Sequence, residues 1–200
     1  MSNPLIPLTL LFSLMATAAV ATPLNIQVYN PGEQAVFPVS SELVTGDKEA
    51  LLVVPQVMNA SQLTVDGEVI EVKALNTPYA YLWAPSVKTA FGGVGIYSGV
   101  HVWMADSQTQ ALRDQWVATL DQLLALQPAR VIPGHYLGDL PPKGEAVAFT
   151  RDYVQRFERE LATNPHSAAL IHAMTQAYPA LPVDDGLAIG AKVATGEMKW

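Results

Sequence analysis

The chain contains four histidines, and His135 is the one whose sequence context suits chemistry best. It lies in the segment 131–136, just past the carboxyl end of a short apolar run at residues 129–132. That run predicts a buried strand. Ligand-binding and catalytic groups collect at this edge of a sheet, because the strand fixes the backbone while the loop exposes the side chain. A neutral imidazole there suits a divalent metal such as zinc. The alternative is a turn histidine that only hydrogen-bonds to the backbone.

The other histidines carry weaker signals. His101 precedes a predicted helix, where it either lines a pocket or is a structural loop residue. Trp103, two residues later, and Tyr136, next to His135, are further candidates for lining such a cleft. We expect His166 to be exposed to solvent. His172 falls inside a predicted helix and is expected to be structural.

No other motif in the sequence supplies a catalytic centre. Cysteine is absent, which excludes disulfides, thiol nucleophiles and cysteine-ligated zinc. There is no Gly-x-Ser-x-Gly nucleophile elbow. The segment Gly92-Gly93-Val94-Gly95 lacks the lysine of a phosphate-binding loop and does not open a helix, so it predicts a tight turn between strands.

Length and composition indicate a globular protein. The 200 residues suit one domain, and 50% hydrophobic residues with 14% charged ones exclude a disordered tail protein. Eleven basic residues against eighteen acidic ones give a net charge of −7. This balance argues against binding to nucleic acids or to anionic membrane surfaces, both of which favour a basic face.

The N-terminus resembles an export signal. An apolar run over residues 5–20 ends in Ala19-Val20-Ala21, a small-x-small cleavage pattern, and it is too short and too interrupted to span a bilayer. We therefore predict a signal peptide at residues 1–21, a mature domain at residues 22–200 and a periplasmic location, with no stable membrane span after cleavage. The first four residues carry no Lys or Arg, which leaves an uncleaved anchor or a buried N-terminal segment as alternatives.

Turn signals and hydrophobic spacing predict an α+β fold with a strand-rich N-terminal half and a helical C-terminal half. A hairpin with an Asp66-Gly67 turn is the strongest local signal in the first half. Strands are predicted at residues 26–29, 36–39, 43–44, 50–54, 62–65, 68–75, 79–83 and 129–132. Helices are predicted from Asp106 or Ser107 to about 127, over 145–162, after an N-cap at Ser167, and from Asp184-Asp185.

The chain resembles an exported branch of the metallo-β-lactamase superfamily. The blocks that carry the resemblance are Asn30-Pro31-Gly32, residues 36–41, Gly92-Gly93-Val94, residues 99–106, Pro133-Gly134-His135-Tyr136, residues 149–153 and residues 196–200. The resemblance implies an αββα sandwich with its active site at one edge of two sheets. It also implies zinc, and hydrolysis of a lactam, ester or thioester by a metal-bound hydroxide. His135 matches the histidine that closes the family's metal site.

The chain departs from the family pattern at the metal ligands. The His-x-His-x-Asp-His signature is absent, and a unit of order 30 residues is missing between about Leu52 and Val53. Val94 stands where many members carry a bridging aspartate, and residues 75–78 replace an intermediate histidine. Only His135 remains of the expected ligands, whereas a catalytic zinc usually takes three protein ligands. We therefore expect an incomplete αββα sandwich that does not bind zinc and is inactive or impaired as a hydrolase.

Three interpretations of function are open at this point. The first is a zinc-dependent hydrolase of the metallo-β-lactamase type, acting on a small-molecule substrate. The second is a non-catalytic exported scaffold or binding protein on the same fold, with a cleft near His101, His135 and Trp103. The third is a chain shortened by deletion, or by an error in the gene sequence, whose intact relatives are enzymes.

The missing unit leads to a prediction about self-association. Loss of a central strand and its covering helix exposes apolar sheet surface or an unpaired edge, both of which favour association with a second copy or another chain. Size-exclusion chromatography of the purified mature protein is expected to show a species larger than a monomer. A stable, compact monomer would contradict the prediction.

Overall fold

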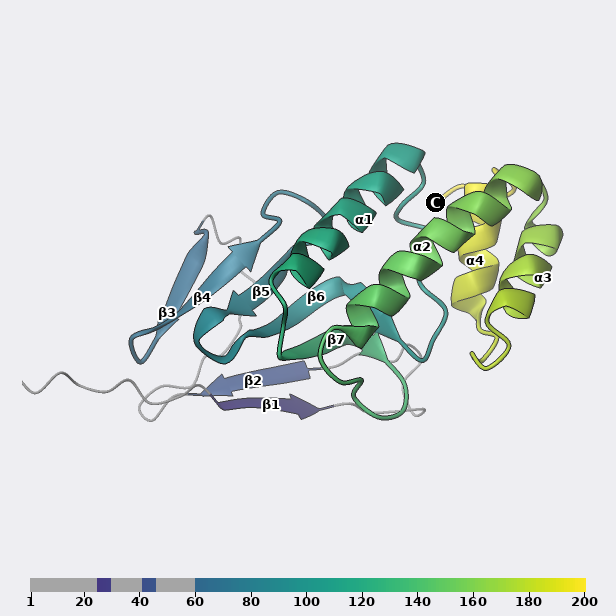
Figure 1. The fold of residues 1–200 in the computed structure, drawn as a ribbon. Coiled ribbons are helices and arrows are strands. Elements are labelled where there is room, and N and C mark those ends of the chain that lie inside the picture. Colours follow the sequence, from purple (N-terminus) through teal and green to yellow (C-terminus); the bar gives the residue numbers. More distant parts are fainter. Residues whose placement is uncertain (1–24, 30–40, 46–59) are drawn as a thin grey trace, which may run out of the picture.

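The computed structural model describes residues 25–29, 41–45 and 60–200 of the chain, and in this part the fold is α+β, with strands preceding helices (Figure 1). The predicted signal peptide, the predicted strands at 36–39 and 50–54 and the Leu52–Val53 junction lie outside the described residues. The strands are β1 (Asn25–Tyr29), β2 (Ser41–Thr45), β3 (Gln62–Val65), β4 (Glu68–Lys73), β5 (Tyr81–Ala84), β6 (Thr89–Ser98) and β7 (Arg130–Tyr136). The helices are the 3-10 turn η2 (Pro85–Val87), α1 (Gln110–Ala125), α2 (Glu145–Thr163), α3 (Ser167–Ala177) and α4 (Asp185–Ala194).

Five of the described strands form one sheet in the order β3-β4-β5-β6-β7. Neighbours pair antiparallel from β3 to β6, whereas β6 and β7 pair parallel. Parallel neighbours need a crossover connection, and α1 supplies it. Strands β1 and β2 form a separate antiparallel pair. The predicted Asp66-Gly67 hairpin is confirmed: both residues have positive φ, as the two-residue turn between β3 and β4 requires.

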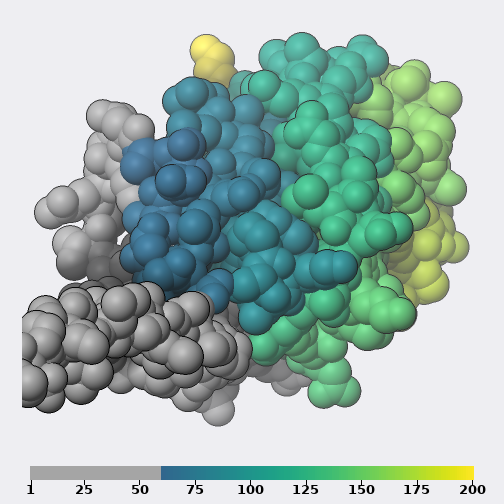
Figure 2. Space-filling view, turned by 60° about the vertical axis from the view of Figure 1, so that its left-hand side comes forward, coloured from purple at the N-terminus to yellow at the C-terminus, as the bar shows by residue number. Residues whose placement is uncertain are grey.

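Both faces of the five-stranded sheet are buried. Successive residues of a strand point to opposite faces, and the neighbours Ala90 and Phe91 belong to different hydrophobic clusters, as do Val131 and Ile132. Helices α1 and α2 cover one face, and the β1–β2 pair lies on the opposite side (Figure 1). In the space-filling view the strands, blue to teal, lie directly against the green helices (Figure 2). No described helix has the length and apolar character needed to cross a membrane.

The helix bodies are confirmed, but two predicted caps are wrong. Helix α1 begins after Thr109, whose side chain accepts a hydrogen bond from the backbone N–H of Leu112, so it does not begin at Asp106 or Ser107. The N-cap of α3 is His166, and Ser167 is the first helical residue. Asp184 does cap α4, accepting a hydrogen bond from the backbone N–H of Leu187. A Ser, Thr or Asp one turn early can mimic a cap in sequence, because the cap is defined by backbone geometry.

The glycine-rich segment at residues 92–95 is not a turn between strands, as the sequence predicted, but part of β6. Its pairing with β7 is irregular, with register shifts on both sides of Gly93. A Cβ at Gly134 of β7 would lie 2.6 Å from the carbonyl oxygen of Gly93. Glycine here allows two backbones to approach closely within a sheet, a second meaning of strand glycines besides turns.

Gly99 leads from β6 into the loop that carries His101. A substitution at this position measures whether the backbone around that loop can move to accept a side chain. Gly99 and Gly138 both have positive φ, +69° and +82°. A Cβ at Gly99 would lie 2.4 Å from the carbonyl oxygen of Leu137, whereas nothing lies within 4 Å of one at Gly138. Gly138→Ala is expected to lower the free energy of unfolding by about 1 kcal/mol, from backbone strain alone. Gly99→Ala is expected to lower it by about 1–3 kcal/mol more, from the added clash.

Urea denaturation of the two variants measures this difference, and Gly138→Ala controls for the shared strain. Equal losses of stability would show that Leu137 moves aside without penalty and that the loop is not fixed at this point.

Candidate functional site

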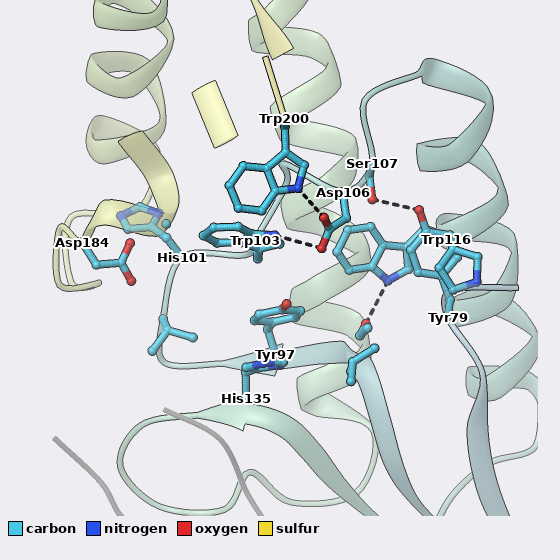
Figure 3. Close-up of a pocket in the computed structure, with 15 residues that line it drawn as sticks. Tyr79, Tyr97, His101, Trp103, Asp106, Ser107, Trp116, His135, Asp184 and Trp200 are labelled. Atoms are coloured by element: carbon cyan, nitrogen blue, oxygen red, sulfur yellow. Dashed lines mark hydrogen bonds between the residues drawn. The ribbon is translucent and has the colours of Figure 1, made fainter. Parts of the chain in front are cut away.

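A cavity of about 690 Å³ lies at the end of the sheet where β6, β7, the loop before α1 and the start of α4 meet (Figure 3). This volume falls within the range of small-molecule sites, about 300–1,000 Å³. Its walls come from β6, β7, α1, the start of α4, two loops and Trp200. The described residues that line it are Pro78, Tyr79, Val94, Gly95, Tyr97, Val100, His101, Trp103, Asp106, Ser107, Trp116, His135, Asp184, Gly186 and Trp200.

One wall is a stacked pair of rings, Trp116 of α1 and Tyr79 before β5. Their centroids lie 4.8 Å apart with an interplanar angle of 9°. The indole N–H of Trp116 donates to the carbonyl oxygen of Gly95 at 2.8 Å, and a Cβ at Gly95 would lie 3.0 Å from that nitrogen. The hydroxyl of Tyr79 hydrogen-bonds to the Ser107 hydroxyl at 2.8 Å. The polar tips of both rings are therefore bound to protein groups.

A second stacked pair lies on the neighbouring strands β6 and β7. Tyr97 and His135 are register partners, and their ring centroids lie 4.5 Å apart with an interplanar angle of 7°. Thr150 of α2 fixes Tyr97, because its hydroxyl accepts from the Tyr97 N–H at 2.8 Å. His135 Nδ1 is buried without a hydrogen-bond partner among the described residues. Burial lowers the pKa of His135, and a hydrogen bond to the backbone of Val94 opposes this shift.

His101 lies across the pocket from Trp116 and Tyr79 and is 3% exposed (Figure 3). Its Nδ1 is 2.8 Å from the hydroxyl of Tyr153, while its Nε2 is buried without a hydrogen-bond partner in the described structure. Burial lowers the pKa of His101, and the negative charge of Asp184 opposes this shift. Both pocket imidazoles therefore favour the neutral form, which leaves a ring nitrogen of each available to a ligand.

Asp106 binds two indoles at the mouth of the pocket. Its carboxylate accepts from Trp103 Nε1 at 3.0 Å and from Trp200 Nε1 at 2.6 Å. The two indole rings meet edge to face, with centroids 5.2 Å apart. Figure 3 shows Trp200 above Trp103, with the Asp106 carboxylate between their N–H groups. One carboxylate thus orients two tryptophans whose positions in the chain are far apart.

The segment that carries Trp200 is anchored at two earlier points. Gly196 has a φ of +77° and ends α4, with hydrogen bonds from Gly196 N–H to Val193 and from Glu197 N–H to Lys192. The carboxylate of Glu197 then accepts from the backbone N–H of Ser167 at 2.9 Å and from its hydroxyl. This carboxylate caps the start of α3, and those hydrogen bonds to Ser167 lower the pKa of Glu197.

The structure brings three of the sequence-predicted residues together: His135, His101 and Trp103 all line the pocket. Tyr136 is buried but is not among the lining residues, because successive side chains of β7 point to opposite faces. The sequence predicts His135 just past the end of a strand, whereas in the structure it lies within β7.

Outside the pocket, His166 is exposed, as predicted. His172 is exposed as well, contrary to its predicted structural role, because it lies on the outer face of α3.

Sequence reasoning missed most of the aromatic wall. Trp116 carried a signal only as part of the apolar stripe of a helix, and Asp184 only as a helix start. For Asp106 the sequence predicts only a helix cap. Nothing in the spacing connects it with Trp200, which lies 94 residues further along the chain. Contacts between such distant positions depend on the tertiary fold.

The described residues do not form a zinc site. All four histidines of the chain lie in this part, and no three His, Asp or Glu side chains within it are close enough together to hold a metal ion. His135 has an unpartnered Nδ1, but its ring is stacked on Tyr97, and His101 Nδ1 is bound to Tyr153. Even with the unpartnered Nε2 of His101 included, two imidazoles are short of the three protein ligands that zinc usually takes.

Comparisons with known proteins add no assignment to this geometry. No family model matches the chain, and no curated protein matches it. Inference about function therefore depends on the pocket itself.

The two buried imidazoles predict how stability depends on pH. Burial places the folded-state pKa of His101 and of His135 below their ordinary value of 6.5, so below that pH the unfolded chain binds more protons than the folded one. The free energy of unfolding is therefore expected to fall as the pH is lowered from about 7.5 to about 5.5. The His101→Gln/His135→Gln double variant is expected to show a smaller fall.

Urea denaturation at the two pH values measures this dependence. His172→Gln, on the exposed face of α3, is the matched single-histidine control. Stability that stays constant or rises toward the lower pH in the unsubstituted protein would contradict the burial of neutral imidazoles.

Proposed function

We propose that this chain is an exported domain of the metallo-β-lactamase type that binds a small, mainly apolar organic molecule and does not use zinc to hydrolyse it. The observation that carries the proposal is the cavity of about 690 Å³ walled by Trp103, Trp116, Trp200, Tyr79 and Tyr97. Such a site buries most of a small ligand, and aromatic walls supply large contact areas with little conformational freedom to lose.

The hydrogen bonds of the wall support binding through ring faces. The indole N–H groups of Trp103 and Trp200 are bound to Asp106, and that of Trp116 to Gly95. Because these polar groups already have protein partners, a ligand meets mainly the apolar faces of the rings. Burial of apolar ligand surface contributes roughly 25 cal/mol per Å².

The assignment to the metallo-β-lactamase type rests on the sequence blocks that resemble this superfamily. The α+β architecture and the burial of both sheet faces are consistent with an incomplete αββα sandwich. Four of those blocks contribute side chains to the pocket lining: Val94 from Gly92-Gly93-Val94, four residues from 99–106, His135 from Pro133-Gly134-His135-Tyr136, and Trp200 from 196–200. Export through a signal peptide at residues 1–21, and a periplasmic location, belong to the same proposal.

Zinc-dependent hydrolysis is the second candidate, and one observation favours it: the buried, unpartnered Nδ1 of His135. In that case His135 would be a metal ligand. The described residues supply no second and third ligand beside it, so the binding function is the one that the geometry supports better.

Binding of a neutral aromatic probe tests the proposal. N-phenyl-1-naphthylamine, whose fluorescence rises in apolar surroundings, is expected to bind with a stoichiometry of one per chain. Trp103→Ala is expected to weaken binding by about tenfold, because it removes an aromatic anchor worth about 1–2 kcal/mol. Val69→Ala is the control, since Val69 is a partly exposed apolar residue of β4 that does not line the pocket.

Two outcomes contradict the binding proposal. The first is a probe that does not bind, or that binds equally to the Trp103 variant while both variants keep the unfolding midpoint of the unsubstituted protein. The second concerns zinc: elemental analysis of protein purified without chelators is expected to show far less than one zinc per chain. Stoichiometric zinc that is lost in His135→Ala would support the hydrolase instead.

A further inference from the structure

The charges around the pocket all have one sign. Among the fifteen described residues that line it, the fully charged side chains are Asp106 and Asp184, and neither Lys nor Arg is present. The nearby guanidinium of Arg113 is 5% exposed and is bound to Glu158 and to the backbone carbonyl of Ser107, behind the pocket wall. The lining itself therefore carries acidic side chains, while the one nearby guanidinium lies behind the wall and is paired with Glu158.

The influence of these carboxylates extends to the rings. Burial raises the pKa of the Tyr97 hydroxyl, and the charge of Asp106 raises it further. Burial also raises the pKa of Tyr79; the hydrogen bond to Ser107 and the charge of Arg113 oppose this shift, and Asp106 adds to it. Asp184 lies across the pocket from Trp116, beside His101 (Figure 3). The two carboxylates therefore flank the cavity from different sides.

The aromatic walls add to this negative potential. The face of an aromatic ring carries the negative part of its quadrupole, and tryptophan binds cations through its face more strongly than tyrosine or phenylalanine. Three of the four tryptophans of the chain line this one cavity: Trp103, Trp116 and Trp200. Aromatic boxes of this kind suit ammonium groups whose methyl or methylene surface contacts the rings.

The remaining ionisable side chains of the pocket lining that could carry a positive charge are two buried imidazoles. His101 is more than nine-tenths buried and lines the pocket with its Nε2 unpartnered, and His135 Nδ1 is unpartnered as well. Burial lowers the pKa of both imidazoles, so neither brings a positive charge to the pocket near neutral pH. The two histidines therefore leave the negative character of the aromatic, carboxylate-flanked cavity unchanged.

We infer that the ligand of this pocket is an organic monocation, an amine or quaternary ammonium compound, held by the tryptophan faces between Asp106 and Asp184. The inference rests on the proposed binding function and specifies its ligand class. Ring faces and carboxylates act together here, because both attract a cation more strongly in a partly desolvated pocket than in bulk water.

A set of isosteric ligands tests the charge preference. Choline, its uncharged carbon analogue 3,3-dimethylbutan-1-ol, and the anionic 3,3-dimethylbutanoate have similar shapes and differ in charge. Each is titrated against the full chain, with tryptophan fluorescence and displacement of N-phenyl-1-naphthylamine as readouts. Choline is expected to bind at least about tenfold more tightly than the alcohol, and the anion more weakly than both.

Asp184→Asn tests whether a carboxylate in the pocket is responsible. Asparagine retains the N-cap of α4, which limits damage to the fold. The ratio of choline affinity to alcohol affinity is expected to fall by about fivefold in this variant. Asp185→Asn is the matched control, because it removes the same charge from an exposed neighbour that does not line the pocket, and the ratio is expected to stay unchanged.

The outcomes separate this inference from the binding function. If the neutral probe binds but choline has no advantage over the alcohol, or the anion binds best, the cation inference is wrong and the apolar pocket stands. A preference for choline that persists in Asp184→Asn and in Trp103→Ala would place the cation elsewhere and also overturn the inference. If the neutral probe does not bind at all, the binding function itself fails.

Discussion

The Asp106 carboxylate fixes the two tryptophans at the mouth of the pocket. It lies in the loop between β6 and α1, and its two oxygens accept the indole N–H groups of Trp103 and Trp200. That loop is fixed from behind by Arg113, which donates to the carbonyl of Ser107 and pairs with Glu158 of α2. Charge-assisted hydrogen bonds of this kind are about twice as strong as neutral ones. Without this carboxylate, two of the three pocket tryptophans would lose the contact that orients them.

The local structure was predictable from sequence, and the pocket was predictable only in part. The Asp66-Gly67 pair predicted its hairpin correctly, because the two-residue turn needs a positive φ at both positions and few residue types adopt one readily. A cleft near His101, Trp103 and His135 was expected only from the resemblance to a known family, because no strand was predicted before His101 to fix its position relative to His135. The contact between Asp106 and Trp200 carries no periodic signal. The turn predicted at residues 92–95 was wrong, because glycine is favoured both in turns and where two strands approach closely.

The chemistry of the pocket follows from which polar groups of its lining residues already have hydrogen-bond partners in the protein and which do not. Indole N–H groups and the Tyr79 hydroxyl are bound to protein groups, so the rings offer their faces. Two buried imidazoles are kept neutral and each retains an unpartnered nitrogen. The described residues thus present an aromatic cavity lined by two acidic side chains, and this is the feature from which we propose binding of a small organic molecule.

Nuclear magnetic resonance of the indole N–H groups tests the central claim, binding at the tryptophan wall, most directly. The chain has four tryptophans, and Trp83 lies in the hydrophobic core away from the pocket, as an internal control. On titration with N-phenyl-1-naphthylamine, the account predicts that the indole signals of Trp103, Trp116 and Trp200 shift together with one saturation curve, while that of Trp83 stays in place. Unchanged signals from the three pocket tryptophans, or a shift confined to Trp83, would contradict it.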